Sequence, residues 1–288
     1  MADVDGSSIL YHYLQKDLRR TNYPMYLNIV MQLVTDLGIW IHPDDYCKLP
    51  ILYPYAARDH NCRKKPPGKS TDSWGQPNMK TGIQKDDNTH IKNFGQSKKN
   101  KIESFTVKRY NGKSIGKNFV ASHVWRELDG SGDLLASRDH RLFSFCPNLV
   151  WLPKEISKFT DREGSVIQSF LQKLSLHIYK DIEMPNQLKP IVKQSWDLLL
   201  SKPISVDLDD DCMPSLERLS FLRINESTIN TRLKKIKSLG DSLHRHGNGL
   251  TFDKPKISSK YDPHISLIEQ NAALELGDWL VNLHDACC

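Results

Sequence analysis

Among all the side chains of this chain, one histidine and one asparagine are the best placed for chemistry. His123 ends an apolar run that is typical of a β-strand, and Asn148 lies in a second apolar run 25 positions later. A helix is predicted to begin at Lys154, and it carries Ser157 and Asp161, which follow Asn148 by 9 and 13 positions. This order places one imidazole and one carboxamide where a pair of strands meets a helix.

Such an arrangement suits hydrolysis of a phosphodiester. The reaction needs a general base that activates water, a cation that offsets charge on the phosphate, and a group that fixes the tautomer of the base. His123 is the predicted base, and Asn148 is predicted to brace the loop behind it. Asp161 is the best ligand on the helix for a hard cation such as Mg²⁺ or Mn²⁺, because it is a carboxylate.

The same residues carry a resemblance that covers about residues 103 to 180. Ala121–Trp125, His140, Asn148–Pro153 and Phe159–Asp161 resemble the ββα-metal fold of the HNH endonucleases. They are most similar to a bacterial restriction and defence subgroup with the pattern A-S/C-H-V-W and N-L-V-x-L-P. The resemblance implies an HNH-type DNA endonuclease that uses Mg²⁺ or Mn²⁺. It assigns the base to His123, the loop brace to Asn148 and the metal ligand to Asp161.

Two positions differ from the family pattern. Ser122 stands where the common family has Asp before the histidine, and Ser157 occupies the usual ligand position on the helix. Serine is a weak ligand for a hard cation. Either Asp161 and His140 make up the metal site, or metal binding is weakened or lost. In the second case the protein is a catalytically degenerate nucleic-acid binder that retains the ββα fold. A helical protein whose basic loop binds a protein partner is a third reading.

Positive charge is concentrated in one segment. Residues 56–118 contain 15 Lys and Arg against 5 Asp and Glu, whereas the rest of the chain has 25 against 29. A basic segment beside a mildly acidic body favours a polyanion partner, here DNA, with RNA left open and a solvated linker as the alternative. The predicted phosphate contacts are Lys64, Lys65, Lys98 and Lys99, together with the guanidinium groups of Arg126 and Arg138.

The predicted fold class is α+β and mostly helical. An HNH-like core at 101–182 follows an N-terminal helical region at 1–55 and a basic loop at 56–100, and a C-terminal helical region spans 183–288. A hairpin is predicted to pair 105–109 with 115–121 around the Asn111-Gly112 turn, and Trp125 and Trp151 are predicted to pack in the core. Helices or amphipathic stretches are predicted at 7–20, 24–39, 154–161, 166–179, 191–200, 214–222, 226–243 and 263–284.

The cysteines and the hydropathy indicate the compartment. Six cysteines show no CxxC spacing, and neither a signal peptide nor a long apolar run is apparent. We therefore expect a cytoplasmic protein with free thiols and no membrane segment. The resemblance makes a homodimer plausible, because enzymes of this kind often cut both strands as dimers.

Overall fold

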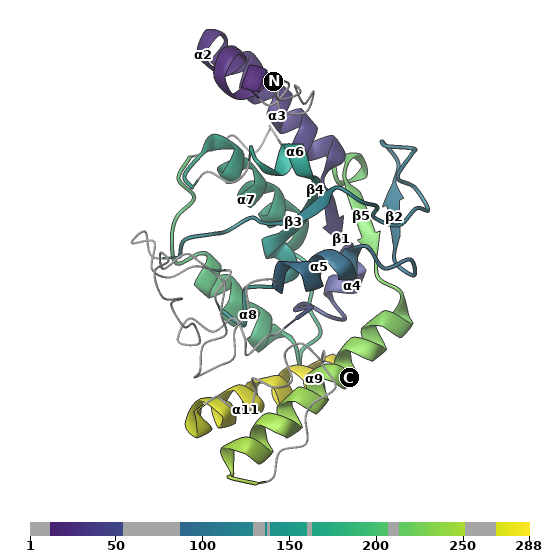
Figure 1. Ribbon diagram of the computed structural model, residues 1–288, viewed down its shortest axis with the longest axis vertical. Coiled ribbons are helices and arrows are strands. Elements are labelled where there is room, and N and C mark those ends of the chain that lie inside the picture. The colour runs from purple at the N-terminus through teal and green to yellow at the C-terminus, as the bar shows by residue number, and fades with distance from the viewer. Residues whose placement is uncertain are drawn as a thin grey trace, which may run out of the picture.

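The protein has an α+β fold, as predicted, and helices account for more than half of the residues that the structure describes. The computed structural model describes residues 12–53, 87–128, 136, 139–159, 163–206, 213–250 and 269–288. Figure 1 shows a central sheet surrounded by helices, with the first helices projecting at one end and a pair of long helices lying at the other.

The sheet is mixed and has five strands in the order β2-β5-β1-β4-β3. The central pair β1 and β5 is parallel, and the remaining neighbours are antiparallel. β2 and β3 are therefore the two edge strands. The strands are β1 (Ile39–Ile41), β2 (Lys101–Ser104), β3 (Phe119–His123), β4 (Leu149–Pro153) and β5 (Ser220–Arg223).

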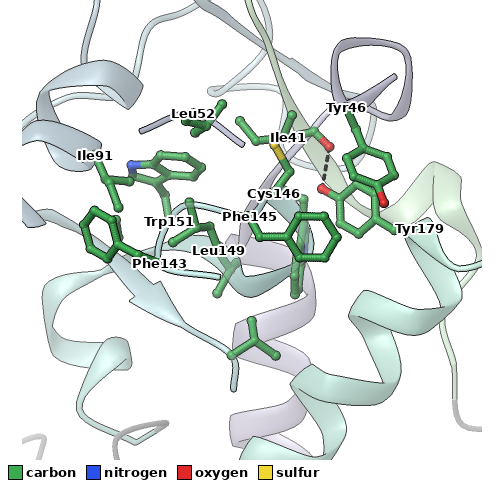
Figure 2. Close-up of a cluster of buried hydrophobic side chains, with 14 of the residues drawn as sticks. Ile41, Tyr46, Leu52, Ile91, Phe143, Phe145, Cys146, Leu149, Trp151 and Tyr179 are labelled. Atoms are coloured by element: carbon green, nitrogen blue, oxygen red, sulfur yellow. Dashed lines mark hydrogen bonds between the residues drawn. The ribbon is translucent and has the colours of Figure 1, made fainter. Parts of the chain in front are cut away.

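Helices cover both faces of this sheet. On one face, the Trp40 ring packs edge-on against Tyr179 of α7 (Val166–Tyr179) at 6.4 Å between centroids. The Tyr179 hydroxyl donates a hydrogen bond of 2.6 Å to the Ile41 carbonyl, as Figure 2 shows. Trp151 points to the opposite face, because it pairs with Ile39 and successive strand residues alternate. There Gly95 of α5 (Asp87–Gly95) lies so close that an added Cβ would be 2.4 Å from the Trp151 indole nitrogen.

Local capping explains where the principal helices begin. The Asn22 side chain accepts from the Met25 amide at 3.2 Å at the start of α3 (Tyr23–Leu37), where Pro24 occupies the first turn. The Ser165 hydroxyl caps α7 by accepting from the Gln168 amide at 3.2 Å. The bounds of α7 confirm the predicted range 166–179, and Trp125 and Trp151 are buried as predicted, with 2% and 0% of their surface exposed.

Two long helices form the C-terminal end of the molecule. α9 (Glu226–Gly247) and α11 (Gln270–Cys287) lie side by side in Figure 1, and a Cβ on Gly240 would meet Val281 at 3.0 Å, so the two backbones approach closely. The remaining helices are η1 (Tyr13–Leu18), α2 (Arg19–Thr21), α4 (Pro43–Tyr46), η5 (Cys146–Asn148), α6 (Lys154–Ser157), α8 (Lys189–Leu199) and η7 (Leu216–Arg218). None of these described helices is long and apolar enough to cross a membrane.

The two central strands were missed by the sequence prediction. The helix predicted to continue to residue 39 ends at Leu37, because Gly38 is extended at φ −70° and ψ 137°, and β1 follows it directly. The amphipathic stretch predicted at 214–222 is a short 3-10 turn followed by β5. All three residues of β1 are buried, so it lacks the alternation that identifies a half-exposed strand.

The predicted hairpin is wrong in its pairing, although its turn is present. Gly112 has φ 72°, and its amide donates to the Ile102 carbonyl at 2.8 Å, while the Ile102 amide donates to Lys113 at 2.7 Å. After Lys113 the chain leaves β2 and crosses to the other edge of the sheet. As a result β2 pairs with β5, and the two antiparallel strands that lead into a helix are β3 and β4.

The helix predicted at 154–161 is shorter in the structure. α6 ends at Ser157, and a tight turn from Ile156 to Phe159 follows, with 160–162 outside the described residues. The sheet also draws β1 from the predicted N-terminal region and β5 from the predicted C-terminal region. One sheet thus joins segments from both sides of the predicted core.

Candidate functional site

The register of β3 and β4 brings His123 next to Asn148. His123 pairs with Leu149 at the end of the two strands. Its Nε2 lies 2.9 Å from the Phe143 carbonyl oxygen, and its ring packs against the Phe143 ring at 5.5 Å. A carbonyl oxygen can only accept a hydrogen bond, so Nε2 carries the proton in the neutral ring and Nδ1 carries the basic lone pair. The half-buried imidazole is thereby held in one tautomer.

Asn148 hydrogen-bonds to two segments of the chain: the residues that follow His123 and the loop at 139–145. Its side chain is fully buried. The Oδ1 atom accepts from the Trp125 amide at 2.7 Å, and Nδ2 donates to the Leu142 carbonyl at 3.0 Å. Its main-chain carbonyl also accepts from the Val124 amide at 3.0 Å. This is the geometry expected of a residue that braces the loop.

An ion pair fixes the loop at 139–145 that supplies these carbonyl groups. Asp139 accepts from the Arg141 amide at 2.8 Å and from Arg141 Nε at 2.9 Å. The Asp139 carbonyl accepts from the Phe143 amide at 2.8 Å. Burial disfavours the charged form of Asp139, but the hydrogen bonds and charge of Arg141 outweigh it and lower the pKa of the carboxyl.

Gln168 is a positioning residue that the sequence interpretation missed. It is 2% exposed, and its Nε2 donates to Glu163 at 3.0 Å and lies 3.4 Å from the Val124 carbonyl. Its Oε1 accepts from the Gly164 amide at 2.7 Å. The N-terminus of α7 is thus tied to the residue after His123. The spacing of Ser165 and Gln168 is that of a capping box and could have identified this residue.

A partly exposed charge cluster extends from Gln168. Lys202 Nζ lies 3.1 Å from Glu163 Oε1 and 3.5 Å from Glu127 Oε2. Burial disfavours the charged form of Lys202, but the hydrogen bond and charge of Glu163 outweigh it and raise the pKa of the ammonium group. The cluster holds one cation between two carboxylates, and we read it as a structural link between the start of α7 and the segment after β3.

Neither serine at a predicted metal position is close to the His123 ring. Ser122 faces away from it, and Ser157 lies at the other end of the strand pair. Ser122 is 7% exposed and points to the sheet face opposite His123, because neighbouring strand residues alternate. Ser157 is 6% exposed, and its hydroxyl donates to the Lys154 carbonyl at 2.8 Å. α6 begins beside Phe119, at the end of the strand pair opposite His123. Four strand residues, roughly 13 Å, separate these ends.

His140 and Arg126 are close in sequence to the residues of the site. His140 precedes Phe143 by three residues, and its ring packs edge-on against Trp279 of α11 at 4.7 Å. Arg126 follows His123 by three residues, and its carbonyl accepts from the Ala136 amide at 2.7 Å. His140 thus lies in the loop that contains Phe143, and Arg126 lies in the segment that follows His123.

Only some of the residues predicted to contact phosphate lie within the part of the chain that the structure describes. Lys98 and Lys99 are exposed in the turn after α5, and Lys99 Nζ lies 3.3 Å from the Ser227 hydroxyl at the start of α9. They are far from His123 in the sheet order, beside β2 rather than β3. The other predicted residues, Lys64, Lys65, Arg138 and Asp161, lie outside the described residues.

The predicted metal site has no counterpart among the described residues. Among those residues, no group of three or more His, Cys, Asp or Glu side chains is arranged to hold a metal ion. Asp161, the metal ligand that the sequence predicts, lies outside the described residues.

Comparison of the chain with protein-family models, curated proteins and solved structures gives no match. The function is therefore inferred from the geometry of the chain's own residues.

Proposed function

We propose that this protein is an HNH-type DNA endonuclease that hydrolyses phosphodiester bonds and requires Mg²⁺ or Mn²⁺. A restriction or phage-defence role in the cytoplasm, with a homodimer cutting both strands, completes the proposal. One observation supports it above the others: His123 donates through Nε2 to the Phe143 carbonyl at 2.9 Å. The backbone on both sides of this contact is anchored by the buried side chain of Asn148.

This geometry supports a definite proton transfer. Nδ1 of His123 accepts a proton from water while the water oxygen attacks the phosphorus atom and the bond to the leaving oxygen breaks. The imidazolium that forms donates to the Phe143 carbonyl, whose dipole stabilises the positive charge. Asn148 keeps that carbonyl in place by holding the adjacent Leu142 carbonyl.

A second candidate is a nucleic-acid-binding protein that retains the strand pair without catalysis. The observation that favours it is the Ser157 hydroxyl, which is buried and donates to the backbone of its own helix. A hydroxyl used in this way is poorly suited to bind a hard cation. The two candidates therefore differ in whether Asp161 supplies the metal ligand.

A closed circular plasmid separates the two candidates, because one internal cut changes its mobility. The purified protein should be incubated with plasmid and phage DNA in Mg²⁺, in Mn²⁺ and in EDTA, with His123→Ala in parallel and binding followed by gel shift. The proposal predicts nicked or linear product from the parent with a divalent ion. DNA binding without cleavage in either metal would favour the second candidate.

A further inference from the structure

The segment from Ser97 to Asn118, here named the basic hairpin, contains β2 and its turn. It has seven basic residues and one acidic residue, Glu103. All seven basic side chains are exposed, and none forms an ion pair with another described residue. They are Lys98, Lys99, Lys101, Lys108, Arg109, Lys113 and Lys117.

An exposed aromatic ring lies within this field of positive charge. Phe105 directly follows β2 and is 72% exposed, more than any other large hydrophobic side chain of the described residues. The backbone beside it is fixed, because the Ser104 hydroxyl accepts from the Val107 amide at 3.0 Å and lies 2.8 Å from Ser220. The ring is thus presented on an ordered support rather than buried against the core.

The hydrogen-bonding edge of β2 is already used. The Ile102 amide donates to Lys113 at 2.7 Å, and the Ile102 carbonyl accepts from Gly112 at 2.8 Å. The other side of β2 pairs with β5. A protein partner therefore finds little free edge for an added strand. The groups of the basic hairpin that a ligand can contact are therefore its exposed cations and the exposed ring of Phe105.

We propose that the basic hairpin binds DNA, with the cations on the phosphate backbone and one unpaired base stacked on Phe105. Cations that lack acidic partners release condensed counterions when they meet phosphates, and a stacked base covers an aromatic ring that is otherwise in water. The inference rests on the proposed function in so far as it names the surface that holds the substrate. It also explains why the ring is exposed.

The position of the hairpin sets the length of DNA that it can contact. β2 and β3 are the two edges of the sheet, so four strand spacings, roughly 19 Å, separate the hairpin from the strand that carries His123. This distance corresponds to about five or six base pairs. DNA held by the hairpin and cut at His123 must therefore extend at least that far to one side of the cut.

The first test measures charge. Binding is followed by fluorescence anisotropy in EDTA on a His123→Ala background, so cleavage does not interfere. K108Q/R109Q/K113Q should weaken binding to a 20-base-pair duplex and reduce the log-log salt slope by roughly two to three. The matched control is K180Q/K189Q/K193Q, which removes the same charge from exposed positions on and beside α7 and α8. Equal slopes for the two triple variants would overturn the proposal.

The second test measures stacking. On a single-stranded 12-mer, Phe105→Ala should weaken binding roughly tenfold, and Phe105→Trp should restore it. Phe105→Leu should behave like Phe105→Ala, because leucine keeps apolar surface without an aromatic face. Equal affinities for the Ala and Trp variants would overturn the stacking role.

The outcomes separate this inference from the proposed function. If the parent protein cuts no plasmid but shows the predicted salt slopes and the predicted dependence on Phe105, DNA binding by the basic hairpin is supported and the nuclease proposal is wrong. If the parent protein cuts DNA while K108Q/R109Q/K113Q and Phe105→Ala bind DNA with parental affinity, the proposal for the basic hairpin is wrong and the nuclease proposal stands. The same dependence on an RNA 12-mer, without binding to DNA, would overturn the choice of DNA.

Discussion

The two ends of the β3–β4 strand pair are built differently. At the His123 end, polar atoms of separate segments are joined: Asn148 bonds to Trp125, 23 positions away, and to Leu142 in the preceding loop, and Gln168 reaches Val124, 44 positions away. At the other end, the Ser157 hydroxyl donates to a carbonyl three residues earlier in its own helix. Long-range contacts specify the orientation of a side chain, whereas the local one stabilises a helical turn. The first end is therefore organised around His123, whereas the contact from Ser157 to Lys154 stays within one helical turn.

The largest effect is expected at Asn148. Asn148→Ala leaves the Trp125 amide and the Leu142 carbonyl buried without their partner, so the free energy of unfolding should fall by about 3 kcal/mol or more. Urea denaturation measures this change. Asn230→Ala, at an exposed position of α9, is the control and should change the free energy by less than about 0.5 kcal/mol. Similar values for the two variants would show that the brace is not needed.

Replacing Asp161 tests whether the metal ligand lies on the segment after α6. Asp161→Ala should raise the Mg²⁺ concentration needed for cleavage roughly tenfold or more, because a carboxylate is the strongest hard-cation ligand there. Calorimetric titration with Mn²⁺ in the absence of DNA provides a readout that does not depend on activity. An unchanged titration would assign the ligand elsewhere, with His140 the next residue to replace.

A smaller effect is expected at Asp139, and it depends on pH. Its pKa is lowered in the folded protein despite burial, because Arg141 stabilises the carboxylate. The ion pair therefore adds stability above the ordinary aspartate pKa of 3.8, and this stability is lost as the pH falls through the lower folded value. Asp139→Asn should lower the free energy of unfolding at pH 7 by about 1.5 kcal/mol. The difference between parent and variant should shrink near pH 3, and a difference that grows there would contradict the assignment.

The smallest effect is expected at Ser157. Ser157→Ala loses one local hydrogen bond but gains helix propensity, so stability should change by less than about 1 kcal/mol. The cleavage rate and its Mg²⁺ dependence should stay those of the parent. A marked loss of Mg²⁺ affinity would show that Ser157 is a ligand and would remove the contrast between the two ends of the strand pair.

The sequence predicted those features that local patterns encode. α7 was predicted at its observed bounds because its apolar spacing is local, and the turn at Gly112 followed from its neighbour Asn111. β1 was not predicted, because its three buried residues continue the apolar pattern of α3 across Gly38. The strand that pairs with β2 was not predictable from the turn, because pairing depends on contacts more than a hundred residues apart.

The candidate site shows the same division. The types and spacing of His123 and Asn148 predicted that the two residues belong to one site, and the strand register brings them next to each other. The hydrogen-bond partners of these two side chains could not be predicted, because the Phe143 and Leu142 acceptors are main-chain carbonyls. Every residue carries such a carbonyl, and no motif marks it. Gln168 was not predicted as a site residue, because its contact with the site depends on the packing of α7 against the end of β3.

The central claim is that His123 acts as the general base, and the single-turnover cleavage rate tests it most directly. The rate should be measured for the parent, for His123→Ala and for His177→Ala, which removes an exposed histidine from α7 as a control. The account predicts a fall of about 100-fold or more for His123→Ala, with an unchanged melting transition, and a parental rate for His177→Ala. A folded His123→Ala protein that cleaves DNA at the parental rate would contradict it.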